Sequence, residues 1–161
     1  LEGGLMKMKF KNEIFIQLDI IFDCLKRSSK DISTEIKDGS SYLNLSFTSI
    51  YKIIELINDY FTDERGRKLK SNSMFIQRYN QNSDDFSKIS EGYSTARDKI
   101  YSIIKFELKD EPLNYCNKFN KFHKDRNNIT HPATLRDYKK TTVEENIMFL
   151  SLVTDLLLKI K

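Results

Sequence analysis

The stretch that decides the fold is Thr142–Ile160, TVEENIMFLSLVTDLLLKI, in a chain of 161 residues. Thr142 and Glu145 have the spacing of a capping box, in which each side chain accepts a hydrogen bond from the other residue's backbone N–H. Apolar residues then recur every three or four positions as far as Ile160, which is the period of an amphipathic α-helix. Further apolar residues occupy its other faces: Met148, Phe149, Leu152, Leu156 and Leu158. We therefore expect a long helix that is central to the fold or lies in a subunit interface.

The helical period continues upstream of this stretch. Three earlier segments carry apolar residues spaced by three and four: 10–30, 43–61 and 86–103. The polar segment 62–73 is expected to be a loop, and 74–79 a short helix. A further helix is expected to begin at Pro112, a favoured first-turn residue, and to end at His131, because the residue before Pro132 is disfavoured in the α-conformation. Together these segments predict an all-α bundle of about five helices.

Composition supports this architecture and excludes others. The chain holds 5 glycines and 2 prolines, where average usage would give roughly eleven and eight, and turn-rich β-folds need more. Residues 1–8 are expected to be a cloning remnant or disordered tail, and 9–161 a single helical domain. No apolar run is long enough for a membrane span. Cys24 and Cys116 lack disulfide-framework or zinc spacing, so we expect a cytoplasmic protein.

Both histidines of the chain lie in one polar segment, 123–131, HKDRNNITH. Arg126, Asn127 and His131 fall at the end of the helix that Pro132 terminates. On a continuous helix Arg126 and His131 would point about 140° apart, at about 100° per residue. Because the helix stops at His131, the exit turn could return the imidazole toward Arg126. The segment is therefore the best candidate for a functional site.

This segment resembles the signature of the HEPN superfamily, in which arginine, usually followed by a polar residue, precedes a histidine at the end of a bundle helix. Arg126 and His131 are separated by four residues, within the four to six of the signature, and Asn127 occupies the polar position. The resemblance implies a HEPN-like bundle that forms a symmetric dimer. It also implies metal-independent cleavage of single-stranded RNA at a site composed of both subunits, with no cofactor.

The residue types suit that reaction. Cleaving RNA without a metal requires removing the 2′-OH proton, protonating the leaving 5′-oxygen and stabilising a phosphorane. His131 would be the general acid or base, and Arg126 would hold the charged transition state. Asn127 would contact phosphate or orient the histidine. The products would be a 2′,3′-cyclic phosphate and a 5′-hydroxyl. The resemblance further suggests a toxin or host-defence effector that an antitoxin or other regulatory protein restrains.

Other interpretations of these residues stay open. Cations at a helix C-terminus interact favourably with the macrodipole, which could be the whole role of Arg126 and His131. His123 could join the site or be an ordinary surface histidine. The net charge is +4, and the basic and aromatic residues near the motif could bind RNA or form a solvated face: Lys118, Lys121, Lys124, Arg136, Tyr138, Lys139 and Lys140.

Two other function classes compete with a metal-independent ribonuclease. A catalytically inactive HEPN-like module could use the same bundle for dimerisation or for binding RNA or protein. A metal-dependent hydrolase is disfavoured, because the sequence contains no HExxH, DxD or EF-hand spacing.

Overall fold

The computed structural model describes residues 2–31, 40–61, 100–101, 103–105 and 107–160. The α-helices are α1 (Glu2–Asp31), α2 (Ser40–Tyr60), α5 (Cys116–Thr130) and α6 (Val143–Lys159), with 3₁₀ turns η2 (Pro112–Asn114) and η3 (Leu135–Asp137). Residues 100–101 and 103–105 are also helical, and no strand occurs in the described part of the chain. The prediction of an all-α fold is confirmed there. The predicted loop 62–73, the short helix 74–79 and residues 86–99 of the third long helix lie outside the described residues.

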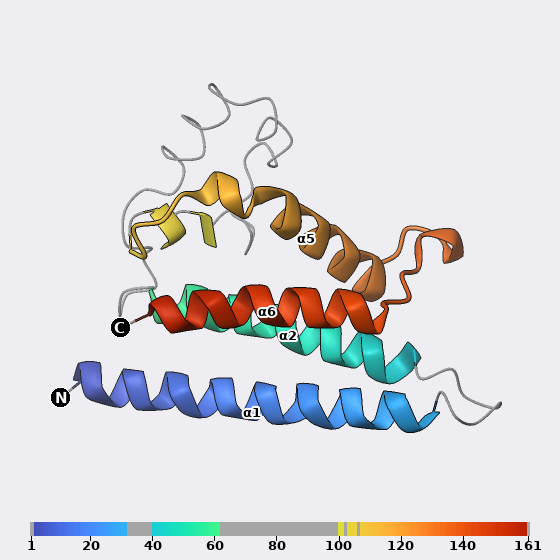
Figure 1. Cartoon of the computed structure of the whole chain (residues 1–161), viewed down its shortest axis with the longest axis horizontal. Coiled ribbons are helices and arrows are strands. Elements are labelled where there is room, and N and C mark those ends of the chain that lie inside the picture. The colour runs from blue at the N-terminus through green and yellow to red at the C-terminus, as the bar shows by residue number, and fades with distance from the viewer. Residues whose placement is uncertain (1, 32–39, 62–99, 102, 106, 161) are drawn as a thin grey trace.

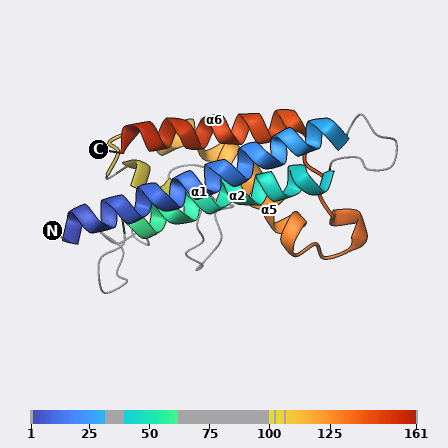
Figure 2. The same cartoon turned by 90° about the horizontal axis from the view of Figure 1, so that it is seen from below.

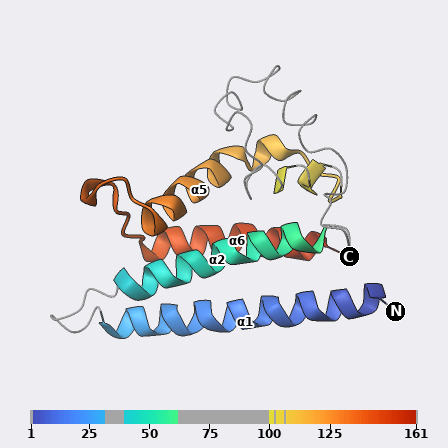
Figure 3. The ribbon, with the colours of Figure 1, turned by 180° about the vertical axis from the view of Figure 1, so that it is seen from behind.

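Helix α2 is the centre of the bundle. It contacts α1, α6 and α5, and α1 lies on the side of the molecule opposite α5 (Figures 1 and 3). Seen from below, α1 and α6 run along the length of α2, and the N-terminus of α1 lies at the same end of the bundle as the C-terminus of α6 (Figure 2). The apolar period of α2 explains this position, because Ile50, Ile53, Ile54 and Ile57 are all buried.

Three phenylalanines join α2, α5 and α6 into one core. Phe122 of α5 stacks on Phe149 of α6 with ring centroids 4.2 Å apart. Phe47 of α2 meets both rings edge-on, at 4.9 Å and 5.3 Å. All three side chains are fully buried, and burial of each contributes roughly 2–3 kcal/mol of hydrophobic stabilisation. This cluster fixes the α5 backbone beside α2, which is where the candidate site lies.

Helix α6 begins as the sequence predicts. Thr142 Oγ1 accepts a hydrogen bond from the Glu145 N–H at 3.1 Å, and Glu145 Oε1 accepts one from the Thr142 N–H at 3.2 Å. Its buried residues include Phe149, Leu152, Val153 and Leu156. Leu158 is 79% exposed, so the apolar residues do not all face the core. No helix in the described part of the chain is both long and apolar enough to cross a membrane.

Two predicted helix boundaries are wrong. Helix α1 begins at Glu2, and it therefore includes residues 2–8, which we expected to lie outside the fold. Gly3 and Gly4 each weaken a helix by about 1 kcal/mol. The ring of Phe10 packs on that of Tyr60, with centroids 4.5 Å apart, and this contact holds the helix whose first turn contains both glycines. At the other boundary, Pro112 opens the short 3₁₀ turn η2, and α5 starts at Cys116.

A three-residue clamp explains the later start of α5. Tyr115 Oη donates a 2.6 Å hydrogen bond to Asp110 Oδ2, and Lys159 at the end of α6 donates to both residues. These bonds, from Lys159 first and Tyr115 second, hold the pKa of the Asp110 carboxyl well below its usual range. The clamp fixes the chain just before α5 to the last turn of α6, so tertiary contacts determine the conformation at Pro112.

Candidate functional site

The end of α5 carries the polar motif, and its stop agrees with the prediction. The helix continues to Thr130, and His131 is the C-cap residue, with its backbone N–H donating to the Asn127 carbonyl at 2.7 Å. The next residue, Pro132, has no N–H with which to continue the helix. Arg126 and Asn127 therefore lie in regular helix, and His131 lies at its edge.

Four side chains form a closed polar cluster between α2 and α5. Tyr51 Oη lies 2.9 Å from His123 Nδ1, and His123 Nε2 lies 3.1 Å from Asn127 Nδ2. Asn127 Oδ1 accepts a 3.2 Å hydrogen bond from Arg126 Nη1. The Arg126 guanidinium lies 4.7 Å from the centre of the Tyr51 ring, a cation–π contact that links the last of these residues to the first. We refer to these four residues as the polar cluster.

The guanidinium of Arg126 faces α2 and solvent. Besides its contacts within the polar cluster, it donates a long 3.5 Å hydrogen bond to Glu55 Oε1. No hydrogen bond joins it to a carbonyl oxygen of the last helical turn in the described part of the chain, so Arg126 does not cap α5. The side chain is 29% exposed. A planar cation that is fixed on one side and accessible on the other is suited to binding a phosphate.

His131 is separated from the polar cluster. Its side chain is exposed and forms no hydrogen bond or ion pair with any residue that the structure describes. Because α5 is continuous to Thr130, Arg126 and His131 diverge by about 140° around the helix axis, and the exit turn does not join the two side chains. Lys124, Asn127 and His131 are instead spaced i, i+3 and i+7, which places them on one face of α5.

The other histidine lies in the cluster. The sequence left His123 as either a surface residue or a member of the site, and the structure places it, half-buried, between Tyr51 and Asn127. Tyr51 and Glu55 were not predicted from the sequence. Their one available signal was a spacing of four on α2, which puts two polar groups on the same face of an otherwise apolar helix.

The segment after α5 is fastened to the first turns of α2. Asn44 Nδ2 donates to the Lys139 carbonyl at 2.9 Å and to Tyr138 Oη at 3.2 Å. Asn44 Oδ1 accepts 2.9 Å hydrogen bonds from both the backbone N–H and the hydroxyl of Thr141. Asn44 and Thr141 are buried. The Lys139 N–H also donates to the Asn128 carbonyl of α5 at 3.2 Å, so residues 138–141 are held against both α2 and the end of α5.

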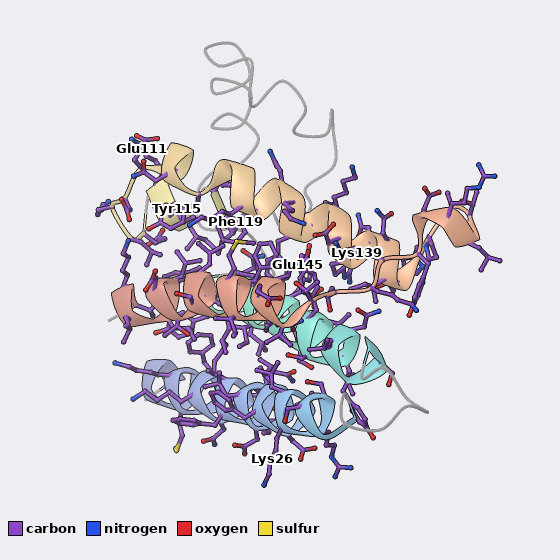
Figure 4. The ribbon with its side chains drawn as sticks, turned by 45° about the vertical axis from the view of Figure 1, so that its right-hand side comes forward. Lys26, Glu111, Tyr115, Phe119, Lys139 and Glu145 are labelled. Atoms are coloured by element: carbon purple, nitrogen blue, oxygen red, sulfur yellow. The ribbon has the colours of Figure 1, made fainter. Side chains whose placement is uncertain are left out.

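The predicted RNA-binding residues fall into two groups. The first group consists of exposed side chains: Lys118, Lys124, Arg136, Tyr138 and Lys140. Lys121, which is also exposed, and Lys139 form the second group. They pair with Glu145 at 3.0 Å and 3.1 Å, and Lys121 also pairs with Asp125 at 2.6 Å. Lys139 and Glu145 lie near each other in Figure 4. The carboxylates offset the charge of Lys121 and Lys139, which makes these two side chains less suited to binding a phosphate. RNA binding stays a prediction for all seven residues.

The ion pairs of Glu145 with Lys121 and Lys139 make a contribution to the stability of the fold that depends on pH. Partial burial alone would raise the pKa of Glu145, but hydrogen bonds from Lys121 and Lys139 outweigh it and lower the pKa to about 2. A carboxyl with a lowered pKa stabilises the fold above its unfolded pKa, here about 4.5, and loses that contribution as the pH falls toward 2.

We expect Glu145→Gln to lower the free energy of unfolding by about 2 kcal/mol at pH 7, a value reduced for solvent screening of half-exposed Lys121. Glutamine preserves the capping box, so the difference between the two proteins should shrink below pH 4.5 and disappear near pH 2. Urea unfolding across this range measures it, with Glu144→Gln as the exposed control. A difference that does not change with pH would contradict the assignment.

Among the residues that the structure describes, no three His, Cys, Asp or Glu side chains are grouped so as to hold a metal ion. Comparisons with protein-family models, with curated proteins and with solved structures find no match. The geometry at the end of α5 is therefore the basis on which a function is proposed.

Proposed function

We propose that the protein is a HEPN-like, metal-independent endoribonuclease that cleaves single-stranded RNA as a symmetric homodimer. One observation carries the proposal: Arg126 and Asn127 are held rigidly on α5, with the guanidinium partly open to solvent, while His131 is exposed one turn further on. This arrangement supplies a fixed phosphate ligand and an accessible proton-transfer group within one short segment.

The separation of Arg126 and His131 supports a composite site. Within one subunit the two side chains diverge around α5, so a single subunit does not direct both at one phosphate. A two-fold axis near the end of α5 would bring two motifs together, and the exposed His131 of one subunit could then act beside Arg126 of the other. Exposed Lys124, on the same helix face as His131, would extend the basic surface toward the RNA backbone.

In such a dimer, one histidine can remove a proton and the other can supply one. One His131 takes the proton of the 2′-OH, and the 2′-oxygen then attacks phosphorus. The bond from phosphorus to the 5′-oxygen breaks, and the second His131 donates a proton to that oxygen. Arg126 stabilises the non-bridging oxygens of the phosphorane. The products are a 2′,3′-cyclic phosphate and a 5′-hydroxyl. In a cell such activity is that of a toxin or antiviral effector, restrained by an antitoxin or other regulatory protein.

A binding module without activity is the second candidate, and one contact favours it. Glu55 lies 3.5 Å from Arg126 and offsets part of the charge that a transition state would use. In this alternative, Arg126 has a structural role in the packing of α5 on α2, and the same surface binds RNA or protein without turnover.

The test compares cleavage of single-stranded RNA, in EDTA, by the wild-type protein and by His131→Ala. We expect the wild type to release 2′,3′-cyclic phosphate ends and His131→Ala to be about 100-fold slower, a typical contribution of general acid–base catalysis. Thr134→Ala, an exposed change in the same exit segment, is the matched control and should keep the wild-type rate.

Light scattering of the same samples should give twice the chain mass of 19.0 kDa. Cleavage at equal rates by wild type and His131→Ala would contradict the assigned role. Dimers that bind RNA without cleaving it would establish the binding module instead.

A further inference from the structure

The hydrogen bonds of the polar cluster determine which nitrogen of His123 carries the proton. Arginine has donors only, so the atom of Asn127 that meets Arg126 Nη1 at 3.2 Å must be the carbonyl oxygen, Oδ1. The other end of the amide, Nδ2, therefore faces His123 Nε2 at 3.1 Å. Because Nδ2 is a donor, Nε2 must be an unprotonated acceptor. The ring proton of a neutral His123 consequently lies on Nδ1, where Tyr51 Oη accepts it at 2.9 Å.

Protonation of His123 is incompatible with this arrangement. A charged imidazole carries hydrogen on both nitrogens, so Nε2–H would meet the Nδ2–H of Asn127. Rotating the amide by 180° does not resolve the conflict, since Nδ2 would then face the donors of Arg126. One of the two hydrogen bonds of the Asn127 side chain must break when His123 gains a proton.

We propose that His123 is a positioning residue for Arg126, and that only its neutral, Nδ1-protonated form holds Asn127 in the orientation that fixes the guanidinium. The inference rests on the proposed function, because it assigns to a third residue the control of the phosphate ligand of that site. The imidazole itself touches no reacting atom. It acts through Asn127, whose backbone carbonyl also accepts the His131 N–H at 2.7 Å.

The charged and titratable groups around His123 agree with a neutral ring. From α2, Tyr51 contacts Nδ1, and Glu55 reaches the cluster through Arg126. From α5, Arg126 contributes a permanent positive charge one hydrogen-bonded residue away. That charge opposes a second positive charge on the imidazole. Glu55 offsets part of it, and Glu55 is also paired with Lys52 of α2 at 3.1 Å.

The first test is independent of activity. Nitrogen NMR of the wild-type protein at neutral pH should show an acceptor-type Nε2 and a protonated Nδ1 for His123. Acidification should shift the side-chain amide signals of Asn127 at the same pH at which His123 gains its proton. A ring protonated on Nε2 at neutral pH, or Asn127 signals that ignore the titration, would overturn the inference even if the protein cleaves RNA as proposed.

The second test uses two replacements of His123. Glutamine supplies an acceptor near the position of Nε2 that does not titrate, whereas leucine supplies none. We expect His123→Gln to keep kcat within about threefold of the wild type and to show a shallower acidic limb of the pH–rate profile. His123→Leu should lower kcat at least tenfold at every pH, with a smaller effect on KM.

Unfolding measurements on both variants separate misfolding from mispositioning, and His123→Gln remains informative if His123→Leu does not fold. Equal kcat in the two variants would overturn the positioning role. Absence of cleavage by the wild type, with the NMR result as expected, would reject the ribonuclease and leave the coupling of His123 to Asn127 and Arg126 established.

Discussion

Arg126→Lys is expected to slow RNA cleavage by about a thousandfold while the protein stays folded. Lysine retains the positive charge, but it loses the planar fork that contacts Asn127 Oδ1 and Glu55 and that, in the proposed function, would also bind a phosphate. Removing a fixed donor to transition-state charge typically costs 10²–10³-fold in kcat, and here the loss of orientation adds to it. Single-turnover cleavage of a labelled RNA at saturating protein measures the step directly.

The control for this change is Arg27→Lys on α1. Arg27 is also an arginine paired with a carboxylate, Asp23 at 3.0 Å, but it lies on the helix opposite α5. Arg27→Lys should leave the rate of RNA cleavage unchanged. Because Arg126 is only partly buried, its replacement should cost about 1 kcal/mol of stability through the lost cation–π and ionic contacts. A rate near that of the wild type would show that a charge without the fork suffices, which would contradict the role assigned to the planar guanidinium.

Phe122→Ala should destabilise the fold by about 3–5 kcal/mol, a large part of the total for a domain of this size. Phe122 is fully buried and contacts a ring from each neighbouring helix, Phe149 of α6 and Phe47 and Tyr51 of α2. Removing the ring leaves a cavity at the point where α2, α5 and α6 meet, and it also withdraws support from Tyr51. Urea unfolding monitored by circular dichroism gives the free energy.

Phe15→Ala supplies the comparison for this core change. Phe15 lies on α1 and is 63% exposed, so its loss should change the free energy of unfolding by less than about 0.5 kcal/mol. The contrast depends on burial alone, since the chemical change is the same. Comparable effects of the two replacements would mean that the aromatic cluster is not the principal core of the bundle.

The parts of the fold that the sequence predicted correctly depend on contacts between close neighbours. The capping box of Thr142 and Glu145 involves residues three apart, and the stop at His131 follows from the proline beside it. The period of α2 was sufficient to predict a helix because its isoleucines repeat at a spacing that no strand tolerates. Such features are determined by residues a few positions apart, and the tertiary structure does not alter them.

Features that depend on distant residues were not predicted. His123 looks like an ordinary surface residue until α2 brings Tyr51 beside it, and Glu55 has no local feature that indicates a contact with Arg126. Lys121 and Lys139 look equally basic until α6 presents Glu145 between them. Pro112 suits a first helical turn, but the clamp of Asp110, Tyr115 and Lys159 directs the chain otherwise. Each case required knowledge of which helices pack together.

The hydrogen bond between Tyr51 and His123 joins residues 72 positions apart, and this separation has a consequence for synthesis of the chain. At 5–20 residues per second, a ribosome takes roughly 4–14 s to pass from one to the other. During that interval α5 has not been synthesised, so α2 cannot pack on it. The loop between residues 51 and 123 must then close before the cluster can form. The polar cluster is therefore among the last parts to assemble, and a nascent chain that has not reached α5 cannot contain it.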